Sequence, residues 1–163
     1  MGCNRNDVIG FTGLVAGLLV LLGGGLPYWA TVTDIGHSGP FVACAGNDLD
    51  NCDAFNPEDL NDKGRALQAF TVLAMLFGLI GMILCVLHGM KHRNYRKEAA
   101  VFMFLAAACG VTAMSMWISW GTNGKCERYT FGNVVSASCS WAFGLFVAGW
   151  CLSLIVSVVL MAD

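Results

Sequence analysis

Charged residues are scarce in this chain of 163 residues, at 12% of the composition. A soluble domain of this size carries about 25% charged residues. Apolar residues make up 56%, and only 3 residues are proline, the residue that most often interrupts a helix. The composition excludes an ordinary water-soluble domain and indicates that much of the chain is solvated by lipid.

Charge is missing altogether from four long stretches, at residues 8–30, 66–87, 99–122 and 130–162. A helix needs about 20 residues to cross the hydrocarbon core of a bilayer. The stretches lack the alternation of apolar and polar residues that is typical of barrel strands. We therefore predict one domain over residues 1–163, with membrane-spanning helices near 8–28, 66–88, 98–120 and 140–161.

The first apolar stretch has two interpretations. A signal peptide has a short apolar core, of about 7–15 residues, followed by a cleavage site with small residues. The stretch here is longer and no clean site follows it, which favours an uncleaved first helix.

The orientation in the membrane follows from the loop at 89–97, which holds four Lys or Arg residues and no acid. The positive-inside rule places this loop in the cytoplasm. Both termini are then cytoplasmic, and the loops at about 29–65 and 121–140 are extracellular. The total count of Lys and Arg is less decisive, because four more of these residues fall in the outer loops.

The cysteines support this orientation, because the two outer loops contain two cysteines each. Extracellular thiols oxidise, so we expect Cys44–Cys52 and Cys126–Cys139 disulfides. Each link would stabilise its loop by about 2–3 kcal/mol on the chain-entropy model. The alternative is four free thiols in a reducing compartment, which requires the basic loop to lie outside.

Two further cysteines, Cys3 and Cys85, lie near the predicted cytoplasmic face and are candidates for palmitoylation. The alternative is that they are ordinary small apolar residues. Because the chain has no CxxC pair and no cluster of histidines, we expect no metal site.

Groups that carry chemistry are nearly absent from the predicted helices. Ionisable residues inside a membrane mark ion paths, proton relays or redox sites. Only His88 qualifies, and it borders the basic loop. The sequence therefore predicts no enzyme, no cofactor and no nucleic-acid partner. It predicts a helical bundle in the lipid bilayer that displays its outer loops.

The first outer loop carries a spaced series of motif residues: Trp29, Gly39, Phe41, Cys44, Cys52 and Arg65. The series resembles the loop signature of the claudin and peripheral myelin protein superfamily. The segment WAFGLFVAGW at 141–150 is similar to the start of the fourth claudin helix. Two departures indicate a divergent member. Pro40-Phe41 replaces Leu-Trp, and the second loop has a cysteine pair that claudins usually lack.

The resemblance implies an all-α membrane protein. Its fold would be a four-transmembrane left-handed helix bundle with a small extracellular antiparallel β-sheet from the two outer loops. Residues 30–35 are β-branched enough to form a strand, and Gly132-Asn133 would turn a hairpin in the second loop. Trp29 and Arg65 would anchor the ends of the first loop at the membrane. The alternative is an interfacial tryptophan and a snorkelling arginine.

The resemblance also implies a function at cell–cell junctions of the plasma membrane, with self-association in cis and in trans. Apolar residues of the outer loops, Phe41, Tyr129 and Phe131, are the predicted contacts. Two alternatives stay open: an auxiliary subunit of an ion channel or receptor, and a structural membrane protein of the myelin or lens type.

Negative charge is concentrated in the first outer loop, where residues 31–62 contain seven acids and no Lys or Arg. In the claudin resemblance, charges of this loop line the gap between cells and select ions. Asp48, Asp50 and Asp53 are the candidates for cation preference, because the Cys44–Cys52 link would hold them or their neighbours in place. The alternative is a solvated loop kept soluble by its charge.

Overall fold

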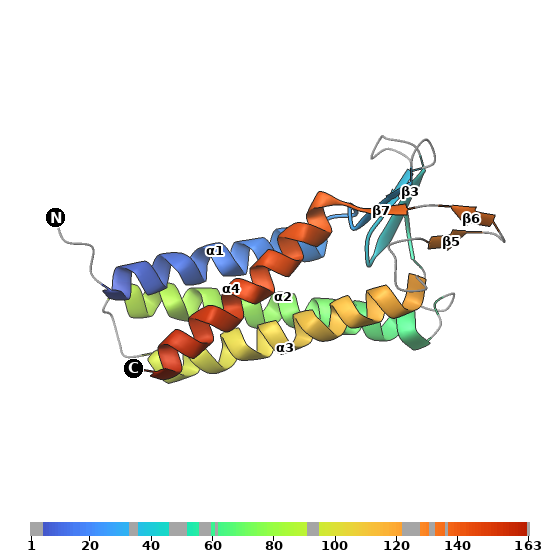
Figure 1. The fold of residues 1–163 in the computed structure, drawn as a ribbon. Helices are drawn as coiled ribbons and strands as arrows, with labels where there is room; N and C mark the ends of the chain where they lie inside the picture. Colours follow the sequence, from blue (N-terminus) through green and yellow to red (C-terminus); the bar gives the residue numbers. More distant parts are fainter. Residues whose placement is uncertain are drawn as a thin grey trace.

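The computed structural model describes residues 5–32, 36–45, 52–55, 60, 62–90, 95–121, 128–130, 133–135 and 137–162. Among these residues, four long helices run side by side (Figure 1). They are α1 (Arg5–Gly25), α2 (Asp62–Gly89), α3 (Arg96–Gly121) and α4 (Trp141–Ala162). Each is long and apolar enough to cross a membrane, which confirms the predicted four-helix membrane fold.

The helix bounds differ from prediction mainly at the end that carries the sheet. The first helix ends at Gly25 instead of residue 28, because Pro27 disfavours helical backbone in the residue before it. The second helix begins at Asp62, four residues before the predicted start at 66, so its first turn contains charged residues. The uncharged stretches therefore predicted where each helix lies, but not the charged or proline-limited residues at which α2 begins and α1 ends.

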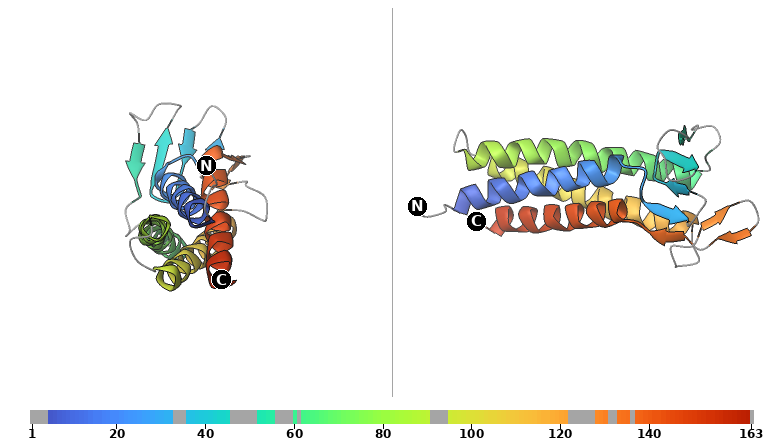
Figure 2. Two further views of the ribbon diagram at one scale, coloured as in Figure 1. Left: turned by 90° about the vertical axis from the view of Figure 1, so that its left-hand side faces the viewer. Right: turned by 90° about the horizontal axis from the view of Figure 1, so that it is seen from above.

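An antiparallel sheet of five short strands lies beyond one end of the bundle, in the order β4-β3-β2-β1-β7 (Figure 2). Its strands are β1 (Ala30–Val32), β2 (Gly36–Ser38), β3 (Val42–Ala45), β4 (Cys52–Ala54) and β7 (Ala137–Cys139). The first loop supplies four of them, and β7 of the second loop pairs with β1, Ala30 opposite Cys139. The predicted sheet from two loops is confirmed.

The strands differ from prediction in two places. The strand expected at 30–35 ends at Val32, and β2 begins at Gly36, whose φ of 148° is one that glycine adopts readily. The predicted second-loop hairpin is present as β5 (Arg128–Thr130) and β6 (Asn133–Val135). The predicted sheet from two loops did not specify which second-loop strand would pair with which first-loop strand, and the structure pairs β7 with β1.

Small residues let the helices approach closely. A methyl group added at Gly13 would lie 2.7 Å from Sγ of Cys85, and one added at Gly17 would lie 3.0 Å from the carbonyl oxygen of Gly78. Both contacts join α1 to α2 within one chain. The small residues of this GxxxG segment therefore serve packing inside the bundle. Large apolar side chains such as Phe11 and Ile155 are more than half exposed on the outside, where lipid would cover them.

Candidate functional site

Trp29 occupies the junction between the sheet and the bundle, and its side chain is fully buried. Its ring centroid lies 4.8 Å from that of Phe146 and 5.3 Å from that of Trp117. The indole Nε1–H donates to the carbonyl oxygen of Gly23 at 2.6 Å. That carbonyl belongs to the last turn of α1, where intrahelical donors run out. One side chain thus contacts α1, α3 and α4.

The backbone of Trp29 joins the two outer loops. Its N–H donates to the carbonyl oxygen of Ser38 in β2 at 3.0 Å. Its carbonyl oxygen accepts from the N–H of Ser140, between β7 and α4, also at 3.0 Å. The segment that the buried indole fixes to the bundle therefore leads into β1 and is hydrogen-bonded to both outer loops.

The motif residue Gly39 is buried where the first loop crosses its own beginning. A methyl group added there would lie 2.8 Å from both the carbonyl oxygen of Leu26 and Cα of Pro27. Because these are backbone atoms of the crossing segment, no larger residue fits without moving it. The next residue, Pro40, accepts a hydrogen bond from Nε2 of Gln68 on α2 at 3.1 Å. This segment is thereby held against the start of α2.

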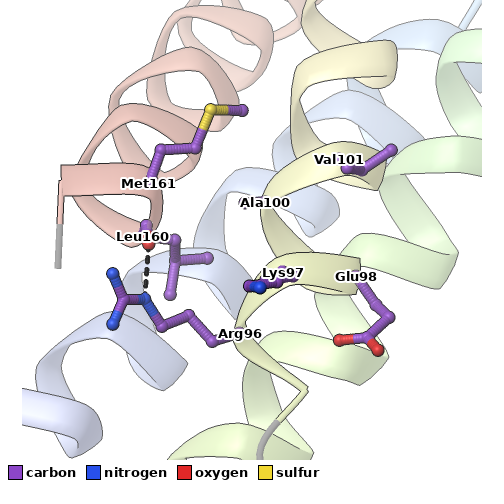
Figure 3. A pocket seen from close by; sticks show the side chains of 7 residues that line it. All are labelled: Arg96, Lys97, Glu98, Ala100, Val101, Leu160 and Met161. Carbon is purple, nitrogen blue, oxygen red and sulfur yellow. Dashed lines mark hydrogen bonds between the residues drawn. The ribbon is translucent and has the colours of Figure 1, made fainter.

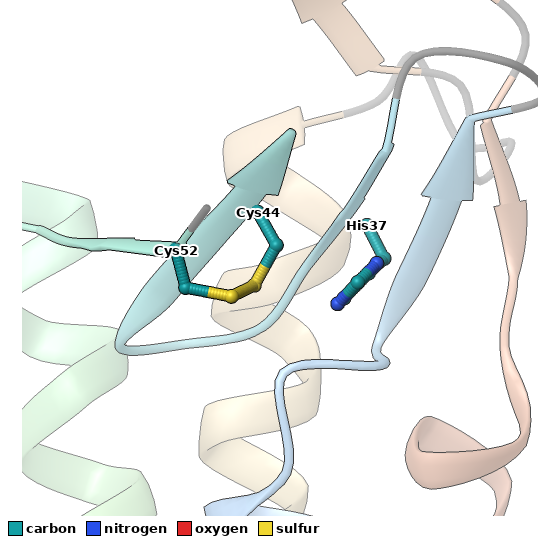
Figure 4. A group of neighbouring side chains, drawn as sticks. All are labelled: His37, Cys44 and Cys52. Carbon is teal, nitrogen blue, oxygen red and sulfur yellow. A yellow bond between two sulfur atoms is a disulfide. The ribbon is translucent and has the colours of Figure 1, made fainter. Parts of the chain in front are cut away.

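Cys44 and Cys52 form a disulfide, as predicted. They lie directly opposite each other on β3 and β4, so the link crosses the edge of the sheet (Figure 4). Cys139, the last residue of β7, is also disulfide-bonded. Its predicted partner Cys126 lies outside the described residues.

Peptide mapping under non-reducing conditions checks both predicted links. We expect the peptides that contain Cys44 and Cys52 to be recovered joined, and likewise those that contain Cys126 and Cys139. Mapping after full reduction is the control. A link between the first and second loops, or four thiols that alkylate in the native protein, would contradict the pairing.

His37 lies beside this disulfide, and sequence reasoning did not single it out. It faces Cys44 across the β2–β3 ladder, is only 4% exposed and stacks on Tyr28 with ring centroids 4.1 Å apart. Its Nε2 has no hydrogen-bond partner within the described part of the chain. Its ligand nitrogen and the two sulfurs lie within 4.8 Å of one another. Because the sulfurs are bonded to each other, they are not thiolate ligands for a metal ion.

Of the other predicted site residues, some lie within the described part of the chain and some lie outside it. Asp53 is exposed on the edge strand β4, Phe41 is half-buried, and Arg65 is exposed in the first turn of α2. Tyr129 lies in β5, but its side chain is outside the described part. Four candidates lie outside the described residues altogether: Cys3, Asp48, Asp50 and Phe131. Their roles stay predictions.

Cys85, a candidate for palmitoylation, is fully buried between α2 and α1. An acyl chain on its sulfur would have to separate these two helices, because Gly13 lies directly against it. The placement favours the alternative interpretation of Cys85 as a small packing residue.

Comparison with known proteins places the chain in a family. The family model of the PMP-22/EMP/MP20/Claudin family matches residues 6–160, which include the four helices almost completely and the whole sheet. The chain therefore belongs to this family of membrane proteins. No individual curated protein matches it significantly, so no single relative narrows its function.

Proposed function

We propose that this protein is a claudin-like cell–cell junction protein that associates side by side in one membrane and across the gap between cells. The observation that supports this most is the sheet that both outer loops build and that Trp29 fixes to the bundle. A rigid sheet beyond the bundle presents its edge and loops as a preorganised surface. Phe41, Tyr129 and Phe131 are the proposed contacts on it.

The proposal includes an orientation, with the sheet outside the cell and both termini in the cytoplasm. Disulfides form and persist in oxidising compartments, and the sheet contains the Cys44–Cys52 link. A segment rich in Lys and Arg joins the end of α2 to the start of α3, and these two helix ends lie at the other end of the bundle. The two criteria agree on which end faces outward.

Immunolocalisation in cells that express the protein natively tests the proposed function. We expect a continuous belt at cell contacts and little protein on free surfaces. Purification of the protein from the same cells shows which other proteins are bound to it. Stable co-purification with a channel or receptor, without enrichment at contacts, would instead favour an auxiliary subunit.

We further propose that the acidic first loop gives the junction a preference for cations. Asp53 is exposed at the sheet edge next to the disulfide, so its charge is held in a fixed place. A dense negative field attracts cations within one Debye length, about 8 Å at physiological salt. Asp48 and Asp50 precede it by five and three positions in the sequence.

Dilution potentials across a sheet of expressing cells measure this preference. We expect the change of Asp48, Asp50 and Asp53 to Asn to lower the Na⁺/Cl⁻ permeability ratio by roughly a factor of two or more. The matched control is Asp7→Asn, which removes an exposed carboxylate at the opposite end of the bundle. An unchanged ratio in the triple variant would leave the acidic loop as a solubility feature.

A further inference from the structure

A cavity of about 820 Å³ lies at the end of the bundle opposite the sheet, between the first turn of α3 and the last turn of α4 (Figure 3). Three charged side chains border it: Arg96, Lys97 and Glu98. It is not part of the sheet or of the loops to which the junction function is assigned. Its lining therefore calls for a separate explanation.

Arg96 is held in place by the end of the neighbouring helix. Its Nε–H donates to the carbonyl oxygen of Leu160 at 2.6 Å. That carbonyl belongs to the last turn of α4, so Arg96 supplies a donor that the helix itself lacks. A guanidinium has five N–H donors, so four remain on the two Nη atoms. They have no partner among the described residues.

Next to the charged groups, the wall of the cavity is apolar and open to the side of the bundle. Val101 is 51% exposed and Met161 is 57% exposed, and both line the cavity. On a membrane-spanning bundle, this side faces the acyl chains. The cavity therefore combines cations at the helix ends with apolar surface toward the bilayer interior.

We propose that this cavity binds an anionic phospholipid of the cytoplasmic leaflet. The phosphate would bind to the Nη atoms of Arg96 and to Nζ of Lys97, and an acyl chain would lie along Val101 and Met161. An arginine whose orientation is already fixed recognises phosphate with little further loss of freedom. Basic pockets at this level of a membrane protein suit acidic headgroups.

The other charges around the cavity have opposite effects on such a ligand. The Glu98 carboxylate repels a phosphate, so the three lining charges sum to one positive charge. Two further basic residues, Lys91 and Arg93, precede Arg96 by five and three positions in the sequence and lie outside the described residues. An experiment must therefore distinguish binding of the lipid inside the cavity from general electrostatic attraction of the lipid to the basic loop.

Native mass spectrometry of the full chain, with phosphatidylinositol and phosphatidylcholine as the probes, makes this separation. We expect phosphatidylinositol to bind more tightly than phosphatidylcholine, which has the same phosphate but no net charge. Lys97→Gln should weaken binding of phosphatidylinositol about five-fold. Arg96→Lys keeps the charge but loses the planar guanidinium with its two Nη donors and the Nε hydrogen bond to Leu160. It should weaken binding by a similar factor. Glu98→Gln should tighten it about three-fold.

The matched control is Lys91→Gln, which removes the same charge from the loop. We expect it to weaken binding less than two-fold, because the proposed site does not include Lys91 and screening reduces the effect of charges outside the site. Melting temperatures of each variant without added lipid verify that the bundle is folded. Soluble inositol phosphate, which lacks acyl chains, should not displace the lipid at equal concentration.

Three results would overturn the proposal: equal losses from Lys97→Gln and Lys91→Gln, equal binding of the two lipids, or displacement by inositol phosphate. The leaflet assignment rests on the proposed orientation of the junction protein. Binding to the purified protein does not depend on that orientation. A failure of lipid binding is therefore distinguishable from a failure of the junction function.

Discussion

Trp29→Ala is expected to lower the free energy of unfolding by about 3–5 kcal/mol, the range for a buried aromatic residue changed to alanine. The substitution leaves a cavity against Phe146 and Trp117 and removes the donor to the carbonyl oxygen of Gly23. Since a domain is stable by only about 5–15 kcal/mol, most of the protein should fail to reach the cell surface. Surface biotinylation and melting in detergent measure both effects.

The chain offers a matched control of the same residue type. Trp141 is 57% exposed at the start of α4 and stacks on Tyr28 with ring centroids 5.5 Å apart, so Trp141→Ala should lose only this contact, about 0.5–1.5 kcal/mol, and leave the surface level nearly unchanged. Trp29→Phe keeps most of the ring contacts but loses the hydrogen bond, and should cost about 1–3 kcal/mol. Equal behaviour of Trp29→Ala and Trp141→Ala would show that Trp29 is merely an interfacial residue.

The contact between α1 and α4 predicts the second large effect, for Gly23→Ala. The added methyl group would lie 2.6 Å from Cα of Phe146, so the two helix backbones must move apart. Overpacking of this kind costs about 1–3 kcal/mol and more where backbone is the obstacle. Gly149→Ala meets the same obstacle further along, 2.6 Å from the backbone nitrogen of Val20. Melting in detergent should show both losses.

Gly25 and Gly144 are the matched controls, since an added methyl group at either position meets no atom within 4 Å. Alanine favours helix over glycine by about 0.8–1.0 kcal/mol, so Gly144→Ala inside α4 should be neutral or stabilising. If Gly149→Ala lowers the melting temperature and Gly144→Ala raises it or leaves it unchanged, the loss at Gly149 is due to its close contact with α1. Destabilisation of similar size at both positions would contradict it.

The helices were predictable because a helix that crosses the lipid bilayer needs about 20 mainly apolar residues, and such stretches are visible in the sequence. Four uncharged stretches predicted four helices, and the structure has them, although it starts α2 earlier and ends α1 before Pro27. The Cys44–Cys52 link was likewise predictable, because two cysteines in one outer loop leave few partners. These inferences need composition and position only.

The pairing of β7 with β1 was not predictable in the same way. A strand of three residues is too short to show the two-residue alternation that marks a sheet. Its place depends on the Trp29–Ser140 backbone hydrogen bond, which joins positions far apart in the sequence.

Burial depth was equally hidden from the sequence. The sequence could not distinguish an interfacial Trp29 from a buried one, because both follow an apolar stretch. The structure buries Trp29 completely, and it buries Cys85 against Gly13. The predicted contact and selectivity residues Asp48, Asp50, Tyr129 and Phe131 await experiment.

Self-association across the gap between cells is the central claim, and a mixed culture tests it most directly. Two cell populations would express the protein with different fluorescent tags and be mixed with untagged cells that lack it. We predict that both tags concentrate where two expressing cells meet, and stay diffuse where an expressing cell meets a cell without the protein. Equal density of the tags at both kinds of contact would contradict the account.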